Sequence, residues 1–359
     1  MNKQLCFELV RDGMAEPNYE EIRQNAEKTS KTPVYIALFG QPGAGKSSLV
    51  NAITGKPDLV KVGVGNDETF EREDHEWNGL FLSDLPGYGT ARFPADTYCE
   101  KFKTDQFDIF LCVTSGKLKE DDILFFRKLR QDRKHCIFVR NKIDAEYQPG
   151  QTDADLRARI KENLAQQIGE SVEIVFTSCR TGEGLDKLQN AIEGSLVGVK
   201  RDRFIRSAAA YSKEFLEKKK KSCRAYSLYA SGASAVANMV PVPGFGFAVD
   251  ITAILAAMKV IRDDFNLTDA RLDMFAHFAP GVAPLINSLV SYATTDGVLQ
   301  LLKRFAAGQA VTEAAKYFPG IGTLLAGSIS FTITLLILSF YIDDCYEIAS
   351  EMLAKHFGG

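Results

Sequence analysis

One stretch of the sequence carries residues of the types and spacing that bind phosphate. Residues 40–47 read GQPGAGKS, which fits the pattern G-x-x-x-x-G-K-[ST]. The stretch follows the apolar run 34–40 and precedes a helix-like segment, 47–54, which is the context that this pattern requires. Glycine-rich backbone can point several N–H groups at phosphate oxygens, and the start of a helix adds partial positive charge. The sequence therefore predicts a loop that holds the phosphates of a nucleotide.

Several residues of this loop have expected roles at the predicted site. We expect Lys46 to reach the β- and γ-phosphates and the Ser47 hydroxyl to ligate Mg²⁺. We also expect Lys46 to take part in catalysis. The residues expected to contact the nucleotide here are Gly40, Gln41, Pro42, Gly43, Ala44, Gly45, Lys46, Ser47 and Ser48.

A second motif for the phosphate side, DLPG, occupies residues 84–87. Asp84 ends a predicted strand, where an aspartate can hold Mg²⁺, usually through water. The backbone N–H of Gly87 can respond to the presence of the γ-phosphate, and we also expect Gly87 to take part in catalysis. This short motif is weak evidence for a nucleotide site when it stands alone, and strong evidence at this distance from a phosphate-binding loop.

The motif NKID, at residues 141–144, predicts which base is bound. The Asp144 carboxylate can accept hydrogen bonds from both N1–H and N2–H₂ of guanine, a donor pair that adenine does not present. The stem of Lys142 can lie over the purine face, and Asn141 can tie this loop to the phosphate-binding loop. An ATP-binding protein would carry this motif only by accident, so the predicted nucleotide is GTP or GDP.

The segment 177–180, TSCR, ends the last predicted strand. It resembles the Thr-Ser-Ala-Lys element of GTPases, in which a backbone N–H meets the guanine O6. We therefore expect Ser178 and Cys179 to contact the nucleotide. Cys179 occupies the small-residue position of this element, and we interpret it as a packed wall of the base pocket rather than a reactive thiol.

The first switch segment is expected between Gly55 and Trp77. A threonine there would close on Mg²⁺ and the γ-phosphate, and Thr69 is the candidate for both the metal and the catalytic role because it directly precedes the polar, strand-like run 70–77. The alternative is that Thr69 is an ordinary exposed residue of that strand.

The residue after Gly87 bears on the rate of hydrolysis. Ras-like enzymes that orient water with a glutamine carry it there, and here the position holds Tyr88, which cannot copy the paired donor and acceptor of an amide. Pro42 crowds the γ-phosphate side, so we expect slow intrinsic turnover. Catalysis would then need a carboxylate such as Asp67 or Glu68, or a group from a second molecule such as Arg92.

The elements that position these residues form two halves. Apolar runs at 34–40, 80–84, 107–114, 135–141 and 172–177 alternate with helix-like stretches, which predicts a parallel sheet covered on both faces. The polar run 70–77 is expected to be an edge strand, antiparallel to its neighbour. The fold class is thus α/β, a doubly wound, mostly parallel Ras-like G domain, with an all-α domain after it.

The predicted domain boundaries follow this change from alternating strands and helices to helices alone. Residues 33–197 form the G domain, 198–359 the helical domain, and 1–32 a helical segment that packs with the latter.

With 45% hydrophobic and 25% charged residues, the chain can bury real cores. Its net charge of −3 argues against a general nucleic-acid binder. Its seven cysteines include no C-x-x-C pair, so we expect a cytoplasmic protein with no zinc site.

Two features of the helical half leave a membrane role open. Residues 321–342 form an uncharged run long enough to span a bilayer, although its small polar residues and its missing basic flank favour a buried bundle helix. The lysine run 218–221 is either a solvated helix face or a contact for anionic lipid headgroups.

The order of these motifs resembles that of the immunity-related GTPases, which are dynamin-like enzymes. The matching segments are GKSS at 45–48, DETFERED at 67–74, DLPGYGT at 84–90 and the small-residue stretch 230–255 with its Pro-Val-Pro-Gly. Two segments depart from the pattern: Asn141 stands where the family usually has Thr, and 177–185 looks more like bacterial translation-associated GTPases. The chain is therefore similar to a divergent, bacterial-type member.

The resemblance implies several functional properties. It implies GTP hydrolysis with GTP-dependent association into a homodimer or larger oligomer, a helical domain that moves with nucleotide state, and membrane association in some members. We expect the helical domain to rotate about residues 194–206. The alternatives are a slow switch that signals by partner binding, and a membrane-inserting helical protein gated by its G domain. No nucleic-acid partner is expected.

Overall fold

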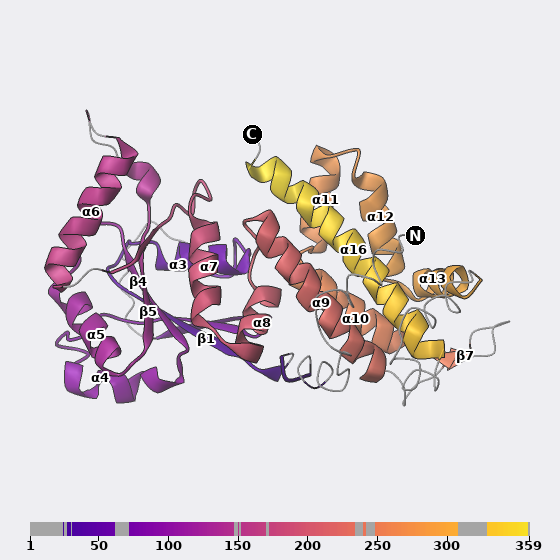
Figure 1. Ribbon diagram of the computed structural model, residues 1–359, viewed down its shortest axis with the longest axis horizontal. Coiled ribbons are helices and arrows are strands. Elements are labelled where there is room, and N and C mark those ends of the chain that lie inside the picture. The colour runs from indigo at the N-terminus through magenta and orange to yellow at the C-terminus, as the bar shows by residue number, and fades with distance from the viewer. Residues whose placement is uncertain are drawn as a thin grey trace, which may run out of the picture. The chain divides into compact units, whose positions relative to one another are not determined.

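The computed structural model describes residues 24, 27–29, 31–61, 72–146, 150, 152–169, 172–233, 240–241, 248–307 and 329–357. Contacts divide the chain into two compact units (Figure 1). The sheet unit is Thr32–Tyr211, and the helical unit joins Met1–Lys31 to Ser212–Gly359. The sequence-based division at residue 198 stays a prediction, and it differs from these units in where it places residues 198–211.

The sheet unit is built on a six-stranded sheet with the order β2-β3-β1-β4-β5-β6. All neighbouring pairs are parallel except β2 with β3, which are antiparallel. Its strands are β1 (Val34–Phe39), β2 (Glu73–Trp77), β3 (Leu80–Asp84), β4 (Ile109–Thr114), β5 (His135–Arg140) and β6 (Ile174–Phe176). The predicted Ras-like fold class, with an antiparallel polar edge strand, is confirmed.

Helices cover both faces of this sheet, which explains why its central strands are apolar throughout. Figure 1 shows α4, α5 and α6 on one face and α3, α7 and α8 on the other. These helices are α3 (Lys46–Thr54), α4 (Ala95–Lys101), α5 (Glu120–Gln131), α6 (Asp153–Ile168), α7 (Leu185–Ser195) and α8 (Gly198–Ser207), with the 3₁₀ turns η1 (Thr104–Gln106) and η2 (Ile143–Ala145). Every residue of β4 is buried. The arrangement is doubly wound, and its loops collect at the carboxyl edge of the strands.

Helix α8 and the residues after it are bonded to the sheet unit. The Ser207 hydroxyl donates to the Asn78 carbonyl in the β2–β3 turn at 2.6 Å, and the Tyr211 hydroxyl donates to the Ala52 carbonyl of α3 at 2.6 Å. The backbone N–H of Ala209 donates to the carbonyl of Ile53 at 2.9 Å. Residues 198–211 therefore continue the packed sheet unit.

The helical unit is an all-α bundle organised around its last helix. Its helices are α9 (Lys213–Ala233), α10 (Ile251–Asp264), α11 (Asp269–Phe278), α12 (Ala283–Tyr292), α13 (Thr295–Ala307) and α16 (Ile329–Phe357), with a two-residue strand pair, β7 (Val240–Pro241) and β8 (Ala248–Val249). Helix α16 packs against α9, α10, α12 and α13. Its side chains Ile333, Ile337, Leu338, Tyr341 and Ile342 are fully buried.

Two sequence features of this unit can be placed in part. Of the run 321–342, residues 333–342 pack inside the bundle, and 321–328 lie outside the described residues. Among the described residues, no helix has the length and apolar character to cross a bilayer. Within the lysine run, Lys219 is buried and donates to the Asp264 carbonyl at 2.7 Å, and Lys220 lies 3.0 Å from an Asp343 carboxylate oxygen. The run is therefore not a uniformly solvated face.

Candidate nucleotide site

The phosphate-binding loop needs glycine at two of its positions. Gly40 and Gly45 have φ angles of 127° and 92°, in the left-handed region that side chains avoid. A Cβ on Gly40 would lie 2.1 Å from the Val113 carbonyl oxygen, and one on Gly45 would lie 2.3 Å from the Asn141 side-chain nitrogen. These glycines thus let the loop turn tightly between β1 and α3 and approach both β4 and the NKID segment.

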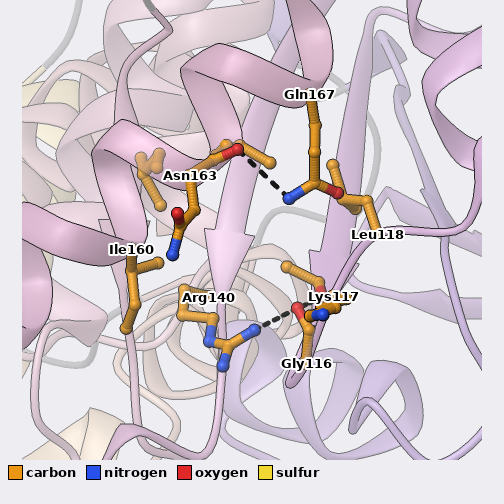
Figure 2. Close-up of a pocket in the computed structure, with 10 residues that line it drawn as sticks. Gly116, Lys117, Leu118, Arg140, Ile160, Asn163 and Gln167 are labelled. Atoms are coloured by element: carbon orange, nitrogen blue, oxygen red, sulfur yellow. Dashed lines mark hydrogen bonds between the residues drawn. The ribbon is translucent and has the colours of Figure 1, made fainter.

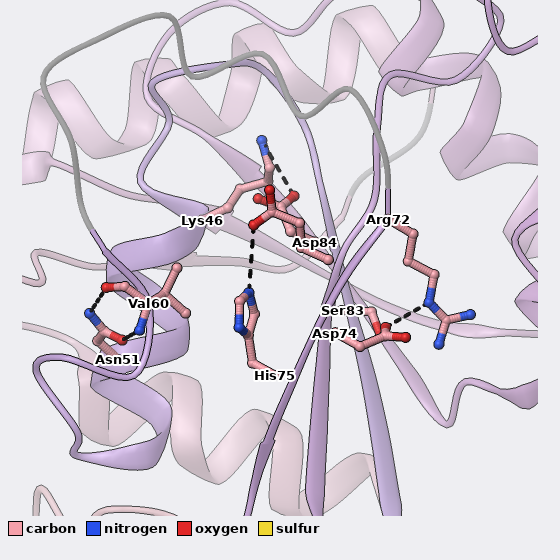
Figure 3. Close-up of polar contacts among 9 residues, drawn as sticks. Lys46, Asn51, Val60, Arg72, Asp74, His75, Ser83 and Asp84 are labelled. Atoms are coloured by element: carbon pink, nitrogen blue, oxygen red, sulfur yellow. Dashed lines mark hydrogen bonds and ion pairs between the residues drawn. The ribbon is translucent and has the colours of Figure 1, made fainter.

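Lys46 begins α3 and is 6% exposed, with its ammonium group inside the loop. Its Nζ donates to the Gly40 carbonyl at 3.1 Å and lies 3.7 Å from Asp84 Oδ1 (Figure 3). Ser47, the next residue of α3, is half-buried, and Asp84 is buried at the end of β3. The structure therefore brings together three residues predicted to serve phosphate and metal, on elements far apart in the sequence.

The remaining loop residues lie around this point. Pro42 and Gly43 are exposed, Ala44 is buried, and Gln41 and Ser48 are half-buried. The Gln41 side-chain amide donates to the Lys117 carbonyl in the loop after β4. Gly87 is exposed three residues beyond the end of β3.

The NKID segment is held against the phosphate-binding loop through Asn141. Its amide donates to the Ala44 carbonyl at 3.0 Å, and its Oδ1 accepts a hydrogen bond from the Thr177 hydroxyl at 3.1 Å. Asn141 is 1% exposed. The predicted link between the two loops is present, and it extends to the strand end that precedes Ser178.

Two other NKID residues, Lys142 and Asp144, lie near the phosphate-binding loop and near Arg180. Lys142 adopts a φ of 62° and is exposed, and its Cε lies 3.9 Å from where a Cβ on Gly45 would stand. The Asp144 carboxylate accepts from Arg180 Nε at 2.7 Å. Hydrogen bonds from the Ser178 hydroxyl and from Arg180 lower the pKa of Asp144 against the opposing effect of burial, so it stays ionised at neutral pH.

Cys179 packs behind the same segment. Its Sγ lies 3.6 Å from Asn141 Oδ1, within hydrogen-bond reach, and burial raises the pKa of the thiol to about 12. A thiol that remains protonated is a poor nucleophile. Ser178 is fully buried, and its hydroxyl accepts from the Thr181 N–H at 3.2 Å. The structure thus gathers Asn141, Asp144, Ser178 and Cys179 in one place, although their roles toward a base stay predictions.

Comparison with known proteins identifies the family. The family model described as Interferon-inducible GTPase (IIGP) matches residues 4–282. The chain belongs to this family. It is therefore a P-loop GTP hydrolase that binds and hydrolyses GTP.

Two individual relatives agree with this assignment, and one solved structure is similar to part of the chain. Interferon-inducible GTPase 5 of Rattus norvegicus is 25% identical over 93% of this chain and 78% of its own length. Interferon-inducible GTPase 1 of Mus musculus is 24% identical over 74% of this chain and 69% of its own. A solved structure of Aquifex aeolicus Era bound to GDP·AlF₄⁻ is 22% identical over 46% of this chain and 57% of its own, with a TM-score of 0.36.

In this chain the segment after Gly87 is anchored by aromatic packing. The Tyr88 ring stacks on Phe125 of α5 with a centroid distance of 4.8 Å, and it meets Tyr98 of α4 edge-on at 5.0 Å. The Tyr98 hydroxyl donates to the Pro86 carbonyl at 2.6 Å. Tyr88 therefore serves as a packing residue at the position where Ras-like enzymes carry a water-orienting glutamine.

Other candidates for hydrolysis are placed differently. Asp67, Glu68 and Thr69 lie outside the described residues. Arg92 is exposed, with its guanidinium 5.5 Å from the centre of the Phe93 ring. The expected trans role of Arg92 stays a prediction.

Within the range 55–77 expected to hold the first switch segment, polar contacts are described on both sides of residues 62–71, which lie outside the described residues. Before them, the Asn51 side chain pairs with the backbone N–H and carbonyl of Val60, each at 2.9 Å (Figure 3). After them, Arg72 donates to the Asp74 carboxylate at 2.6 Å. Val60 and Arg72 are therefore held by neighbouring side chains of the sheet unit.

Sequence reasoning missed several polar groups that line the site. Asp122, in the first turn of α5, is 7% exposed, and burial raises the pKa of its carboxyl while Lys119 and Lys46 lower it. Arg140 directly precedes NKID, Glu146 is the second residue after it, and the two side chains pair with each other. The only signal available for this pair was its position beside the motif.

Proposed function

We propose that this GTPase turns over slowly as a monomer and faster as a GTP-dependent homodimer or oligomer. The packing of Tyr88 carries the proposal. Its ring is committed to Phe125 and Tyr98, so it cannot swing toward an attacking water without leaving the aromatic cluster. Because orientation of the water supplies much of the rate in such enzymes, the missing group has to come from elsewhere.

A second copy of the chain is the source that we favour. Gly87, Gly89 and Thr90 are exposed beside the phosphate-binding loop, as is Arg92, so a partner can reach this segment. A guanidinium brought in from a partner would stabilise the charge that spreads over the γ-phosphoryl oxygens in the transition state. The alternative catalytic group is a carboxylate at Asp67 or Glu68.

We also propose that Mg²⁺ is the metal of this site, held by Ser47 and Asp84, with Thr69 as a third ligand. The fit rests on chemistry: a hydroxyl and a carboxylate are hard oxygen ligands, which Mg²⁺ prefers. Asp84 Oδ1 lies 3.7 Å from Lys46 Nζ, the group expected to meet the β- and γ-phosphates, which supports this assignment. When bound, Mg²⁺ neutralises charge on these phosphate oxygens.

The helical unit is proposed to respond to the nucleotide. Loss of the γ-phosphate releases switch segments in GTPases, and packed units then move as bodies rather than deform. A membrane role for this unit is not favoured by a specific observation, since Lys219 and Lys220 of the lysine run make contacts inside the unit.

Turnover measured over a range of enzyme concentrations tests the proposal. We expect phosphate release per enzyme molecule to rise with concentration, together with a GTP-dependent increase in sedimentation coefficient that GDP does not produce. Turnover of an Arg92→Ala variant mixed with parent protein tests whether Arg92 acts in trans. Constant activity per molecule, with no change in sedimentation, would leave the slow partner-binding switch as the better description.

A further inference from the structure

An ion pair brackets the segment that carries Asp144. Arg140 is the last residue of β5, and Glu146 follows the 3₁₀ turn η2. Arg140 Nη2 contacts Glu146 Oε1, and the two side chains are 12% and 18% exposed. The pair therefore joins the residue before Asn141 to the second residue after Asp144 and closes the loop at its base.

The enclosed turn needs to be held. Lys142 adopts a left-handed φ of 62°. This conformation is unfavourable in free energy for a residue that has a side chain. Three backbone bonds involve the turn: Ala145 N–H donates to the Lys142 carbonyl at 3.0 Å, Glu146 N–H to the Ile143 carbonyl at 3.1 Å, and Ile143 N–H to the Thr177 carbonyl at 3.2 Å. The direction of the Asp144 side chain depends on this turn as well as on the bonds from Ser178 and Arg180, so contacts that fix the turn help to aim the carboxylate.

Arg140 makes a second contact, toward the phosphate side of the site. Its Nη1 donates to the Gly116 carbonyl in the loop after β4 (Figure 2). The next residue of that loop, Lys117, accepts from the Gln41 amide of the phosphate-binding loop. One guanidinium thus braces the NKID turn against a loop that the phosphate-binding loop also contacts.

On the side that faces a cavity, the Arg140 side chain is held by polar contacts and not by packing. A cavity of about 100 Å³ lies there, lined by Arg140 together with Leu118, Ile160 and Leu164. A side chain beside a void lacks dispersion contacts on that side. Its orientation therefore depends on Glu146 and on the Gly116 carbonyl.

We infer that the Arg140–Glu146 pair is a positioning element that sets the aim of Asp144 and so the selectivity for the 2-amino group of guanine. This inference rests on the proposed base-reading role of Asp144. Inosine keeps N1–H and O6 but lacks the 2-amino group, so it makes one of the two bonds that Asp144 can accept. A misdirected carboxylate loses the advantage of guanine over hypoxanthine.

The test compares dissociation constants for GTP and ITP in Arg140→Ala, Glu146→Gln and the charge swap Arg140→Glu with Glu146→Arg. We expect each single change to weaken GTP binding about tenfold, the equivalent of one hydrogen bond to a charged group. The ratio of ITP to GTP dissociation constants should fall toward one in these variants and recover in part in the swap, which restores the ion pair but not the bond to the Gly116 carbonyl. A purely structural loss would weaken both nucleotides alike and lower the melting temperature.

Two controls keep the outcomes distinct. Lys128→Ala breaks an exposed ion pair with Asp132 elsewhere in the same unit and should leave the ratio unchanged. Asp144→Asn should favour XTP over GTP, because the new amide can donate to the C2 carbonyl of xanthine. If Asp144→Asn stays selective for GTP, the base-reading role itself is wrong. If Asp144→Asn switches but the Arg140 and Glu146 variants keep the parent ratio, the positioning role is overturned.

Discussion

The side-chain amide of Asn141 donates to the carbonyl oxygen of Ala44 at 3.0 Å, across 97 residues of sequence. This bond joins the segment that precedes Asp144, the predicted base-reading residue, to the loop predicted to hold the phosphates. Because Asn141 is 1% exposed, both partners are desolvated and the bond cannot be replaced by water without rearrangement. We therefore expect it to hold the two ends of a bound nucleotide at a fixed spacing.

Asn141→Ala tests this link. The change leaves the Ala44 carbonyl and the Thr177 hydroxyl without this partner, and we expect roughly 1–3 kcal/mol of lost stability and weaker binding of GTP and GDP by similar factors. Calorimetric titration with both nucleotides and thermal melting measure the two effects. Asn163→Ala, at an exposed position of α6, is the matched control. A variant that binds as the parent does would show that the link is dispensable.

Lys46→Ala removes the positive charge inside the phosphate-binding loop. We expect nucleotide affinity to fall by roughly one hundredfold, because charge-assisted bonds to phosphate are among the strongest in such sites. Binding of a fluorescent GDP analogue gives the affinity, and Lys187→Ala on α7 controls for the general loss of a lysine. Parent-like binding in the Lys46 variant would mean that the loop does not hold phosphates.

The sequence predicted the fold and the loops of the site because both are local patterns. Apolar runs ending at Gly40, Asp84 and Asn141 place polar residues at the carboxyl edge of one parallel sheet, which the structure confirms. The packing of Tyr88 on Phe125 was not predictable, since ring contacts between segments far apart in sequence leave no periodic signal. The burial of Lys219 was missed for a similar reason: a lysine run gives no sign of which member faces the core.

Tyr98→Phe examines the anchor beneath the second switch. Burial raises the pKa of the Tyr98 hydroxyl, so it remains a donor to the Pro86 carbonyl at physiological pH. Phenylalanine keeps the ring packing but removes the bond, and we expect about 1–2 kcal/mol of lost stability together with an altered turnover rate, since Pro86 directly precedes Gly87. Tyr35→Phe on β1 is the control. Unchanged melting and turnover in Tyr98→Phe would show that the ring alone fixes the segment.

A buried carboxyl in the helical unit predicts a pH dependence of stability. Burial, together with the neighbouring carboxylates of Glu347 and Asp343, raises the pKa of Asp344 to about 7, while Arg304 opposes this. The folded state therefore keeps a proton that the unfolded state releases near pH 4, so stability falls as the pH rises from about 4 to about 7 and is then level.

Asp344→Asn supplies a neutral isostere and removes that dependence. We expect the melting temperature to rise by at least about 2 °C at pH 8, the equivalent of roughly 1 kcal/mol in a domain of this size, and to change little at pH 5. Melting curves at several pH values are the measurement, with Asp296→Asn at an exposed position of α13 as the control. An equal shift at pH 5 and pH 8 would contradict the assigned titration.

The last prediction concerns where the chain bends when the nucleotide changes. Rotation was expected about residues 194–206, but Ser207 and Tyr211, which follow that range, are bonded to the sheet unit through Asn78 and Ala52. Ser212 instead caps the N-terminus of α9, because its carbonyl accepts from the Leu216 N–H at 3.1 Å and its hydroxyl from the Phe215 N–H at 3.2 Å. The chain passes between the two units at two peptides, Lys31–Thr32 and Tyr211–Ser212, and we expect rotation to concentrate at these junctions.

Spin labels at exposed positions 187 in α7 and 274 in α11 would report this rotation as a distance. The chain has seven cysteines, so the labels need a chemistry other than thiol attachment. We expect the distance distribution to differ between GDP and a non-hydrolysable GTP analogue, because the switch segments respond to the γ-phosphate. A pair at positions 161 and 187, both in the sheet unit, should not change, since packed cores resist deformation. Identical distributions for the 187–274 pair with both nucleotides, in monomer and in assembled protein, would rule out a helical unit that moves with nucleotide state.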